Sequence, residues 1–394
     1  MAIQMILFLC SLILLAYFLD LSSSFTRIPS VLSFLFLGWV IQKGVDLSGI
    51  QVPDLNEILP IIGTIGLVLI VLEGSLELQL RQDRVPLIKK AFFMAGVPMV
   101  VFAGALAWFL RSSGEGDWRS ALLNSLPLAI ISSAIAIPSA KRLTAANSEF
   151  VTYESSFSDI LGVIFFNFFA LNETVSGEAI TGFVRDLGFV LIASGLAVGI
   201  LSLLLSRLKH HVKSVPILVM TVGVYAALKV FHLPALIFVM LFGLFLSNNG
   251  RIENLRFLKR FNLARLRDES EPFHQIVVEI AFVVRATFFI LFGYLLKTED
   301  VLNFSSLPFA LGMVGTLFGI RALFLRFSGK PLHPLLFVAP RGLITVLLFV
   351  SITPDLRVSL ISSSLIIQVI LLTAFLMMLG LLKSDRTSVS EVGH

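Results

Sequence analysis

The sequence predicts an all-helical protein that crosses a membrane about 13 times. Of its 394 residues, 57% are hydrophobic and only 14% are charged, and the mean hydropathy is +0.94. A soluble domain carries about 25% charged residues, so this chain has too little polar surface to cover a water-soluble globule. Its apolar residues gather in runs of about 20, the length at which a helix spans a bilayer. The alternating pattern of a β-barrel strand is absent.

The apolar runs follow one another with short polar connections. In order, they cover residues 2–20, 29–45, 56–79, 87–110, 119–142, 149–172, 179–206, 214–230, 232–248, 272–297, 304–326, 332–353 and 358–382. The first run has no basic leader and no small-residue cleavage site, so we expect a retained helix rather than a signal peptide. Residues 383–394 form a short polar tail.

The basic residues predict the orientation of these segments. With the N-terminus outside, 20 of the 30 Lys and Arg lie in cytoplasmic stretches and six lie outside. Cytoplasmic loops are enriched in positive charge, so we expect an external N-terminus and a cytoplasmic C-terminus. The basic residues form no continuous patch, which argues against a nucleic-acid partner. Cys10 is the single cysteine, so an intramolecular disulfide and a CxxC metal site are both excluded.

Two of the predicted segments are interrupted. Segment five (119–142) contains Ser132, Ser133 and Pro138, and segment twelve (332–353) contains the run Pro340-Arg341-Gly342. Proline removes a backbone donor, and neighbouring serines can satisfy the groups that lose partners. Each proline could be a simple kink. However, each segment is second in a group of three, and the two groups have opposite orientations, which favours an inverted repeat with crossing broken helices around a transport site.

Two carboxylates lie in segment six (149–172), at Glu154 and Asp159. An ionisable group at mid-bilayer depth costs roughly 2.5–3.5 kcal/mol on insertion scales unless it has a partner or faces water. On a helix, Ser155 and Asp159 share a face, whereas Glu154 points about 140° away. We therefore expect Asp159 and Ser155 to face a cavity and Glu154 to meet a different neighbour.

Other predicted segments also carry charges. They are Glu73 in segment three, Glu279 and Arg285 in segment ten, Arg321 in segment eleven and Arg341 in segment twelve. A buried guanidinium stays protonated, so each arginine needs an anion or a set of carbonyls. We expect one acid of segment six to be tied to arginine and the other to titrate.

In these residues the chain resembles the monovalent cation/proton antiporter superfamily, especially its electroneutral sodium/proton exchanger branch. Segment six of that family carries Glu-Ser-x-x-Asn-Asp, and here the run from Glu154 to Asp159 has Ser158 in place of the Asn. Leu72-Glu73-Gly74-Ser75-Leu76 and Pro340-Arg341-Gly342-Leu343 are similar to two further family motifs. The usual Thr-Asp-Pro of the first crossover is replaced by Ser132-Ser133-Ala134, which is closer to the potassium-efflux branch.

The resemblance implies a homodimer in which residues 1–382 form one transporter domain. A mobile core (87–172 and 304–382) would slide against a dimerisation part (1–80 and 214–297), with 179–206 as a linker helix. The resemblance also implies a monovalent cation bound at Asp159, and a set of site residues with structural neighbours. Its co-ligands would come from Ser155, Ser158, Glu73, Ser132 and Ser133; Glu154 would pair with Arg321, with Arg285 as a nearby second cation; Pro138, Pro340, Arg341 and Gly342 would form the crossover.

These observations predict a secondary transporter that exchanges Na⁺ or K⁺ for H⁺. A single free carboxylate, Asp159, would trade one proton for one monovalent cation, which predicts electroneutral exchange without a cofactor. A bile-acid-type symporter of an organic anion is the alternative, with Arg285 and Arg341 as anion ligands. No filter-like repeat indicates a channel, and neither HExxH nor Gly-x-Gly-Asp indicates an intramembrane enzyme. The short termini favour a prokaryotic inner membrane.

Overall fold

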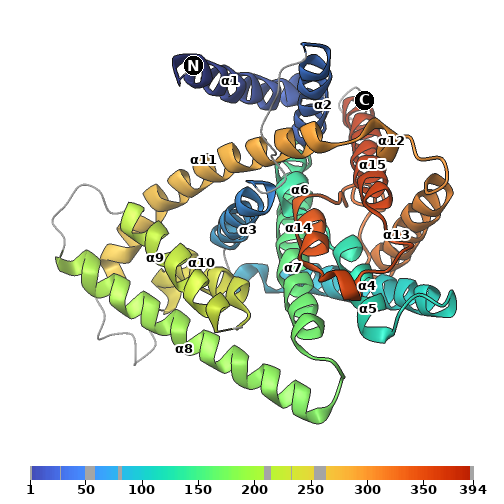
Figure 1. The fold of residues 1–394 in the computed structure, drawn as a ribbon. Coiled ribbons are helices and arrows are strands. Elements are labelled where there is room, and N and C mark those ends of the chain that lie inside the picture. Colours follow the sequence, from blue (N-terminus) through green and yellow to red (C-terminus); the bar gives the residue numbers. More distant parts are fainter. Residues whose placement is uncertain are drawn as a thin grey trace.

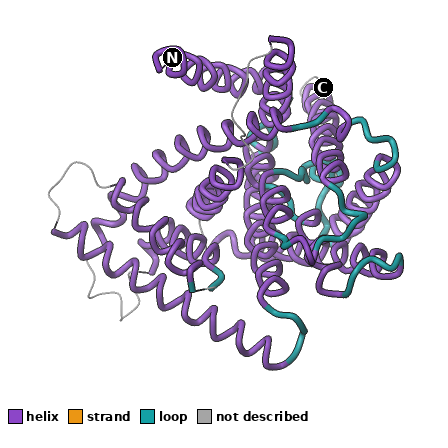
Figure 2. Tube along the Cα trace, in the orientation of Figure 1, coloured by secondary structure: helices purple, strands orange, loops and turns teal. Residues whose placement is uncertain are grey.

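The structure, a computed structural model, describes residues 2–26, 28–48, 58–78, 82–207, 214–231, 233–252 and 263–390. These residues form helices and their connections, without a strand (Figure 2). Eight helical segments among them are long and apolar enough to cross a membrane, and three shorter apolar helices accompany them. The prediction of an all-helical polytopic membrane protein is confirmed.

The first half of the chain contains the first broken segment. Its helices are α1 (Ala2–Thr26), α2 (Ser30–Ser48), α3 (Ile58–Glu77), α4 (Val85–Ser112), α5 (Trp118–Ala129), α6 (Ser133–Ala140), α7 (Ala145–Leu171) and α8 (Gly177–Arg207), with the 3₁₀ turn η1 (Gln82–Arg84) before α4. Helix α5 begins where the Asp117 carboxylate accepts the Ser120 N–H at 2.8 Å, a side-chain cap of the N-terminus. It ends at Ala129 because Ile130 is extended.

The second half contains the other broken segment. Its helices are α9 (Ser214–Val230), α10 (Ala235–Ile252), α11 (Leu263–Leu295), α12 (Thr298–Val301), α13 (Leu307–Phe327), α14 (Leu343–Ser351) and α15 (Ser363–Ser390), with η3 (Pro354–Leu356) after α14. Each predicted segment coincides with a helix or a broken pair. The short α12 was not predicted, and residues 383–390 of the expected polar tail continue α15 as helix; 391–394 lie outside the described residues.

Segment twelve is less helical than the sequence predicts. Residues 330–342 form turns and extended chain, and only Leu343–Ser351 is helical. Three prolines in this stretch, at 331, 334 and 340, remove backbone donors and disfavour a helical conformation in the residues before them. The interruption predicted at Pro340-Arg341-Gly342 is therefore the end of a longer irregular stretch.

The helices pack as two groups (Figure 1). Helices α2, α3, α10 and α11 pack on one another in one group, and α4, α5, α6, α7, α13 and α15 pack in the other. Helix α3 lies between them and contacts α6, α7 and α14. Helix α8 packs against α9, α10 and α11. The division into a mobile core and a dimerisation part stays a prediction.

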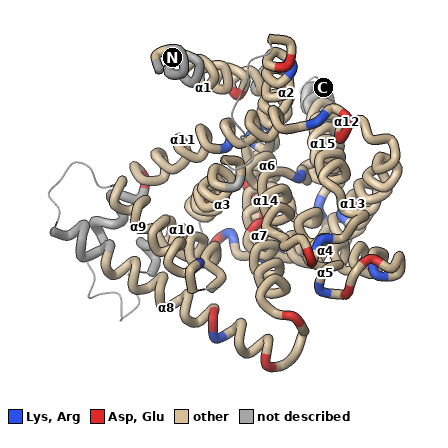
Figure 3. The backbone as a smooth tube through the Cα atoms, in the orientation of Figure 1, with Lys and Arg blue, Asp and Glu red and all other residues tan. Residues whose placement is uncertain are grey.

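Charged residues are sparse along the tube and concentrate toward helix ends, with a few in the interior (Figure 3). Glu154, Asp159, Arg321 and Arg341 are each 4% exposed or less. Since a buried charge is costly without partners, the contacts of these four residues define the site.

Candidate functional site

The two broken segments cross in direct contact. The Ser132 N–H, freed by the end of α5, donates to the carbonyl of Pro340 at 2.9 Å. A methyl group built on Gly342 would lie 2.8 Å from Ser132 Oγ and 2.7 Å from the Ile135 side chain. A side chain at position 342 would therefore displace Ser132 or Ile135, so glycine lets the two broken segments approach closely.

Arg341 neutralises the C-terminus of α5 at this crossing. Its guanidinium donates to the carbonyls of Leu128 at 2.8 Å, Ala129 at 3.1 Å and Ala339 at 2.6 Å. The last carbonyls of a helix have no partner within the helix and carry partial negative charge. The guanidinium of Arg341 therefore offsets this partial negative charge at the crossing.

Asp159 on α7 lies against the start of α6. Its Oδ2 accepts the Ser133 N–H at 3.3 Å and the Ser133 hydroxyl in a very short contact, while Oδ1 is buried and has no hydrogen-bond partner. The N–H groups of a helix N-terminus favour an anion. Asp159 is thus held at one oxygen and open at the other, the arrangement that lets a carboxylate accept a proton or a cation.

Ser158, which stands where the resembling family has Asn, accepts the Ile131 N–H at 2.9 Å through its Oγ. This bond satisfies one backbone donor that the break exposes. The residue was expected among the ion ligands, but its contact lies with the broken backbone. Ser158 therefore positions the crossover beside Asp159.

Neither Ser155 nor Asp159 belongs to the lining of the acidic cavity described below, although both were expected to face a cavity. Its hydroxyl donates to the carbonyl of Val151 at 2.8 Å within α7, and the side chain is 1% exposed. A serine inside a helix commonly bonds the carbonyl four residues earlier. The expected orientation toward the cavity is corrected on this ground.

Glu154 and Arg321 form a bidentate ion pair. The oxygens of Glu154 lie 2.6 and 2.9 Å from the two terminal nitrogens of Arg321. Arg321 also donates to the carbonyls of Leu335 and Val338 in the second break, at 2.8 to 3.2 Å. Every guanidinium nitrogen is thus engaged, and Glu154 is neutralised.

Arg285 pairs with Glu73 at 3.5 Å and does not reach Glu154. The reason is that α11 packs on α3, which brings Arg285 to the Glu73 side of the site. The expectation that Arg285 would be a second cation for Glu154 is corrected. Glu73 lines a cavity without a contact to Asp159 in the described residues.

That cavity has a volume of about 560 Å³ and lies between the helix groups. Pro138 and Gly74 are also part of its lining. Among the described residues, the charged and hydroxyl side chains that line it are Asp20, Glu73, Glu77, Glu279, Lys141, Arg285, Tyr17 and Ser133. Four acids against two bases make the lining acidic, which attracts cations. Glu77 was not among the predicted site residues; it lies four residues after Glu73 on the same face of α3, and this spacing could have placed it here.

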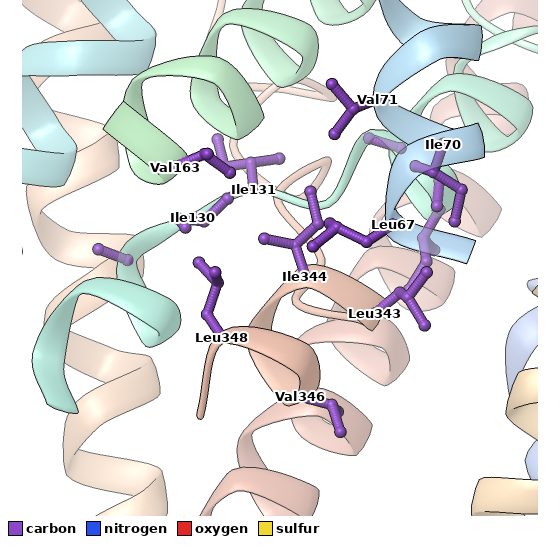
Figure 4. Close-up of a cluster of buried hydrophobic side chains, with 14 of the residues drawn as sticks. Leu67, Ile70, Val71, Ile130, Ile131, Val163, Leu343, Ile344, Val346 and Leu348 are labelled. Atoms are coloured by element: carbon purple, nitrogen blue, oxygen red, sulfur yellow. The ribbon is translucent and has the colours of Figure 1, made fainter. Parts of the chain in front are cut away.

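An apolar cluster seals the crossover beyond the cavity. Figure 4 shows Leu67 of α3 beside Leu343 and Ile344 of α14, with Ile70 and Val71 further along α3. The other labelled side chains come from the first break, from α7 and from further along α14: Ile130, Ile131, Val163, Val346 and Leu348. All ten are buried.

A buried carboxylate beside two crossing broken helices, close to an acidic cavity, is typical of a membrane transporter of cations. Residues 10–383 match the family described as "Sodium/hydrogen exchanger, transmembrane". The chain belongs to this family.

Comparison with solved structures supports the same fold. The chain is similar to the sodium proton antiporter MjNhaP1 from Methanocaldococcus jannaschii at pH 8, with a TM-score of 0.72, 18% identity, and coverage of 96% of this chain and 100% of that one. A second structure of MjNhaP1, described by an electron-microscopy map, gives a TM-score of 0.71 at 19% identity and covers 98% and 97%. A search of curated proteins finds no match.

Proposed function

We propose that the protein exchanges a monovalent cation, Na⁺ or K⁺, for a proton across a membrane, with Asp159 as the exchanging group. The observation that carries this proposal is the contrast within α7. Glu154 is neutralised by Arg321 at 2.6 Å, whereas Asp159 has an unpartnered oxygen next to Ser133, which lines the acidic cavity. Membership of the sodium/hydrogen exchanger family supports the same reaction.

The exchange rests on competition at one carboxylate. Asp159 binds either a proton or a cation, because both need the same negative charge. Hard monovalent ions prefer oxygen ligands, and the nearby oxygens are the hydroxyls of Ser133 and Ser132; the latter is buried without a hydrogen-bond partner. With Glu154 neutralised, one proton is traded for one cation, so the exchange is electroneutral.

Alternating access by an elevator motion is part of this proposal. The core helices α4 to α7 and α12 to α15 carry Asp159, and they move as an elevator against α1 to α3 and α9 to α11. The apolar cluster of Figure 4 supports this arrangement, since it contains residues from both parts and would have to separate when the opposite side opens. With an external N-terminus, the cavity faces the cytoplasm. The protein functions as a homodimer in a prokaryotic inner membrane.

An organic-anion symporter is less well supported. Such a transporter would use Arg285 and Arg341 to bind a carboxylate. Arg285 is paired with Glu73, and Arg341 is surrounded by the carbonyls of Leu128, Ala129 and Ala339. The acidic lining of the cavity would also repel an anion.

The test is Asp159→Asn in proteoliposomes that contain a pH-sensitive dye. Addition of Na⁺, K⁺ or Li⁺ should change the internal pH with the wild type and not with the variant, because the amide binds neither proton nor cation as a carboxylate does. Glu178→Gln, at an exposed acid in the first turn of α8, is the matched control and should retain exchange. Retained exchange in Asp159→Asn refutes the assignment, and a membrane current that follows turnover refutes electroneutrality.

A further inference from the structure

The acidic cavity does not reach Asp159 directly. Gly74 and Ser133 belong to its lining, whereas Asp159 does not and is 4% exposed. Ser133 is also the residue that bonds Asp159 through its hydroxyl and its N–H. A cation that moves from the cavity to the carboxylate therefore has to pass the narrow region beside Ser133.

Gly74 of α3 faces this region from the other helix group. A methyl group built on Gly74 would lie 3.8 Å from Ser133 Oγ and 3.6 Å from Ser156 Oγ. Two hydroxyls from the core, one on α6 and one on α7, thus border the space above a single glycine of α3. We name these three residues, Gly74, Ser133 and Ser156, the glycine passage.

Ser156 has no structural task in the described part of the chain. Its Oγ is buried and has no hydrogen-bond partner, and the side chain is 3% exposed. The neighbouring hydroxyls differ, since Ser155 bonds Val151 and Ser158 bonds Ile131. A buried hydroxyl without a partner is unfavourable, because it has lost its hydrogen bonds to water. On α7, Ser156 lies three residues before Asp159 and therefore on the same side of the helix.

Gly74 also differs from the glycines that allow close helix packing. A methyl on Gly38 of α2 or Gly293 of α11 would overlap the backbone of the facing helix. At Gly74 the same methyl would make only ordinary van der Waals contacts. Packing therefore does not require glycine at this position, whereas an open passage does.

We propose that the glycine passage is the entry route of the monovalent cation to Asp159 and limits the size of the cation that enters. Ser156 provides the first oxygen ligand as the ion loses part of its water shell, Ser133 receives the ion next, and the bare backbone at Gly74 sets the width. This proposal rests on the proposed exchange at Asp159. It adds a specificity-determining position on α3 and a ligand on α7.

The experiment measures exchange in proteoliposomes as a function of Li⁺, Na⁺ and K⁺ concentration, with Gly74→Ala and Ser156→Ala. Gly74→Ala should raise the KM roughly tenfold for K⁺ and only roughly twofold for Li⁺, because an added methyl group discriminates by size. Ser156→Ala should raise the KM for each cation roughly fivefold, the effect of one lost neutral polar contact, while kcat stays unchanged.

Two control variants match these changes away from the passage. Gly104→Ala on α4 adds a methyl that meets nothing within 4 Å, and Ser194→Ala on α8 removes a buried hydroxyl that bonds its own helix at Val190. Both should keep the wild-type KM for all three cations. Size-exclusion profiles and melting temperatures establish that the variants are folded, and Ser156→Ala decides the question if Gly74→Ala is unfolded.

The outcomes separate the two proposals. If Asp159→Asn abolishes exchange but Gly74→Ala and Ser156→Ala keep the wild-type KM, the glycine passage is refuted and the exchange at Asp159 stands. A KM that rises equally for Li⁺, Na⁺ and K⁺ in Gly74→Ala overturns the size-limiting role. If Asp159→Asn retains exchange, the proposed function itself fails, whatever the passage variants do.

Discussion

The two helix breaks meet at Ser132 and Pro340, but they are stabilised differently. In the second break, the carbonyls of Leu335 and Val338 are bound by Arg321, which Glu154 neutralises. The first break is shorter, and its side chains leave polar atoms open, among them Ser132 Oγ and, next to it, Asp159 Oδ1.

This difference indicates which of the two breaks is suited to bind an ion. A buried polar atom without a partner costs free energy, so evolution retains it where a ligand supplies the missing contact. The carbonyls of Leu335 and Val338 in the second break are satisfied by Arg321. The proposed ion site therefore lies at the first break, with Asp159 and Ser133. Three single substitutions, with their controls, test this difference between the two breaks. They are given from the largest expected effect to the smallest.

Arg321→Met tests whether the second break is structural. The change leaves the Glu154 carboxylate buried without a counter-charge and deprives Leu335 and Val338 of their donor. Removal of one partner of a buried ion pair costs about 3–5 kcal/mol, so we expect a large fall in the melting temperature of the detergent-solubilised protein and little folded protein.

The double variant Glu154→Leu with Arg321→Met separates the two effects of losing Arg321: the unpaired charge of Glu154 and the lost hydrogen bonds to the carbonyls of Leu335 and Val338. It removes both charges, so it should recover part of the lost stability. A single variant Arg321→Met with wild-type stability would show that the second break does not depend on this arginine.

Ser158→Ala tests the backbone of the first break. The Ile131 N–H loses its acceptor, which for a buried donor costs about 1–3 kcal/mol. We expect a moderate fall in melting temperature and slower exchange, with Asp159 still able to bind the ion. Ser158→Asn offers an amide oxygen in the same position and should behave closer to the wild type; if both variants lose all exchange while folded, Ser158 is an ion ligand instead.

Asp117→Ala tests the far end of α5, away from both breaks. Loss of this N-cap should cost about 1 kcal/mol, and exchange should persist with an unchanged KM. The hydrogen bond from the Ser120 N–H holds the pKa of Asp117 below its usual value of 3.8. A lowered folded-state pKa gives stability that is present above about pH 4 and is lost as the pH falls through the folded-state value.

Melting temperatures of wild type and Asp117→Ala, measured from pH 6 down to pH 3, check this sign. The two curves should converge at the acid end. A gap that widens as the pH falls would contradict it.

Much of the fold follows from local sequence patterns. The apolar runs predicted the helices, because each must satisfy its own backbone in lipid. The prolines predicted an interruption in segments five and twelve, although Pro138 lies inside α6 and not at the break itself. Glu154 and Asp159 point in different directions around their helix, which predicted that Glu154 has a different neighbour. The family resemblance implied that this neighbour is Arg321.

The remainder depends on packing that local patterns do not contain. Arg285 meets Glu73 because α11 lies on α3. The Ser155 hydroxyl donates to the carbonyl of Val151, because a serine inside a helix can bond its own backbone as well as a group on another element. Helical periodicity identifies a face of a helix; the element that packs against it comes from the assembled fold.

The contact of Arg341 with α5 also constrains how the protein is made. The carbonyls of Leu128 and Ala129 accept hydrogen bonds from Arg341, which lies 213 and 212 residues further along the chain. As the chain is synthesised from its N-terminus, α5 enters the membrane long before residue 341 exists, with its last carbonyls unsatisfied in a medium that cannot solvate them. The first crossover is therefore completed late in biogenesis. A ribosome stalled before α14 would leave a chain that contains Asp159 and Ser133 without the residue that fixes the break beside them.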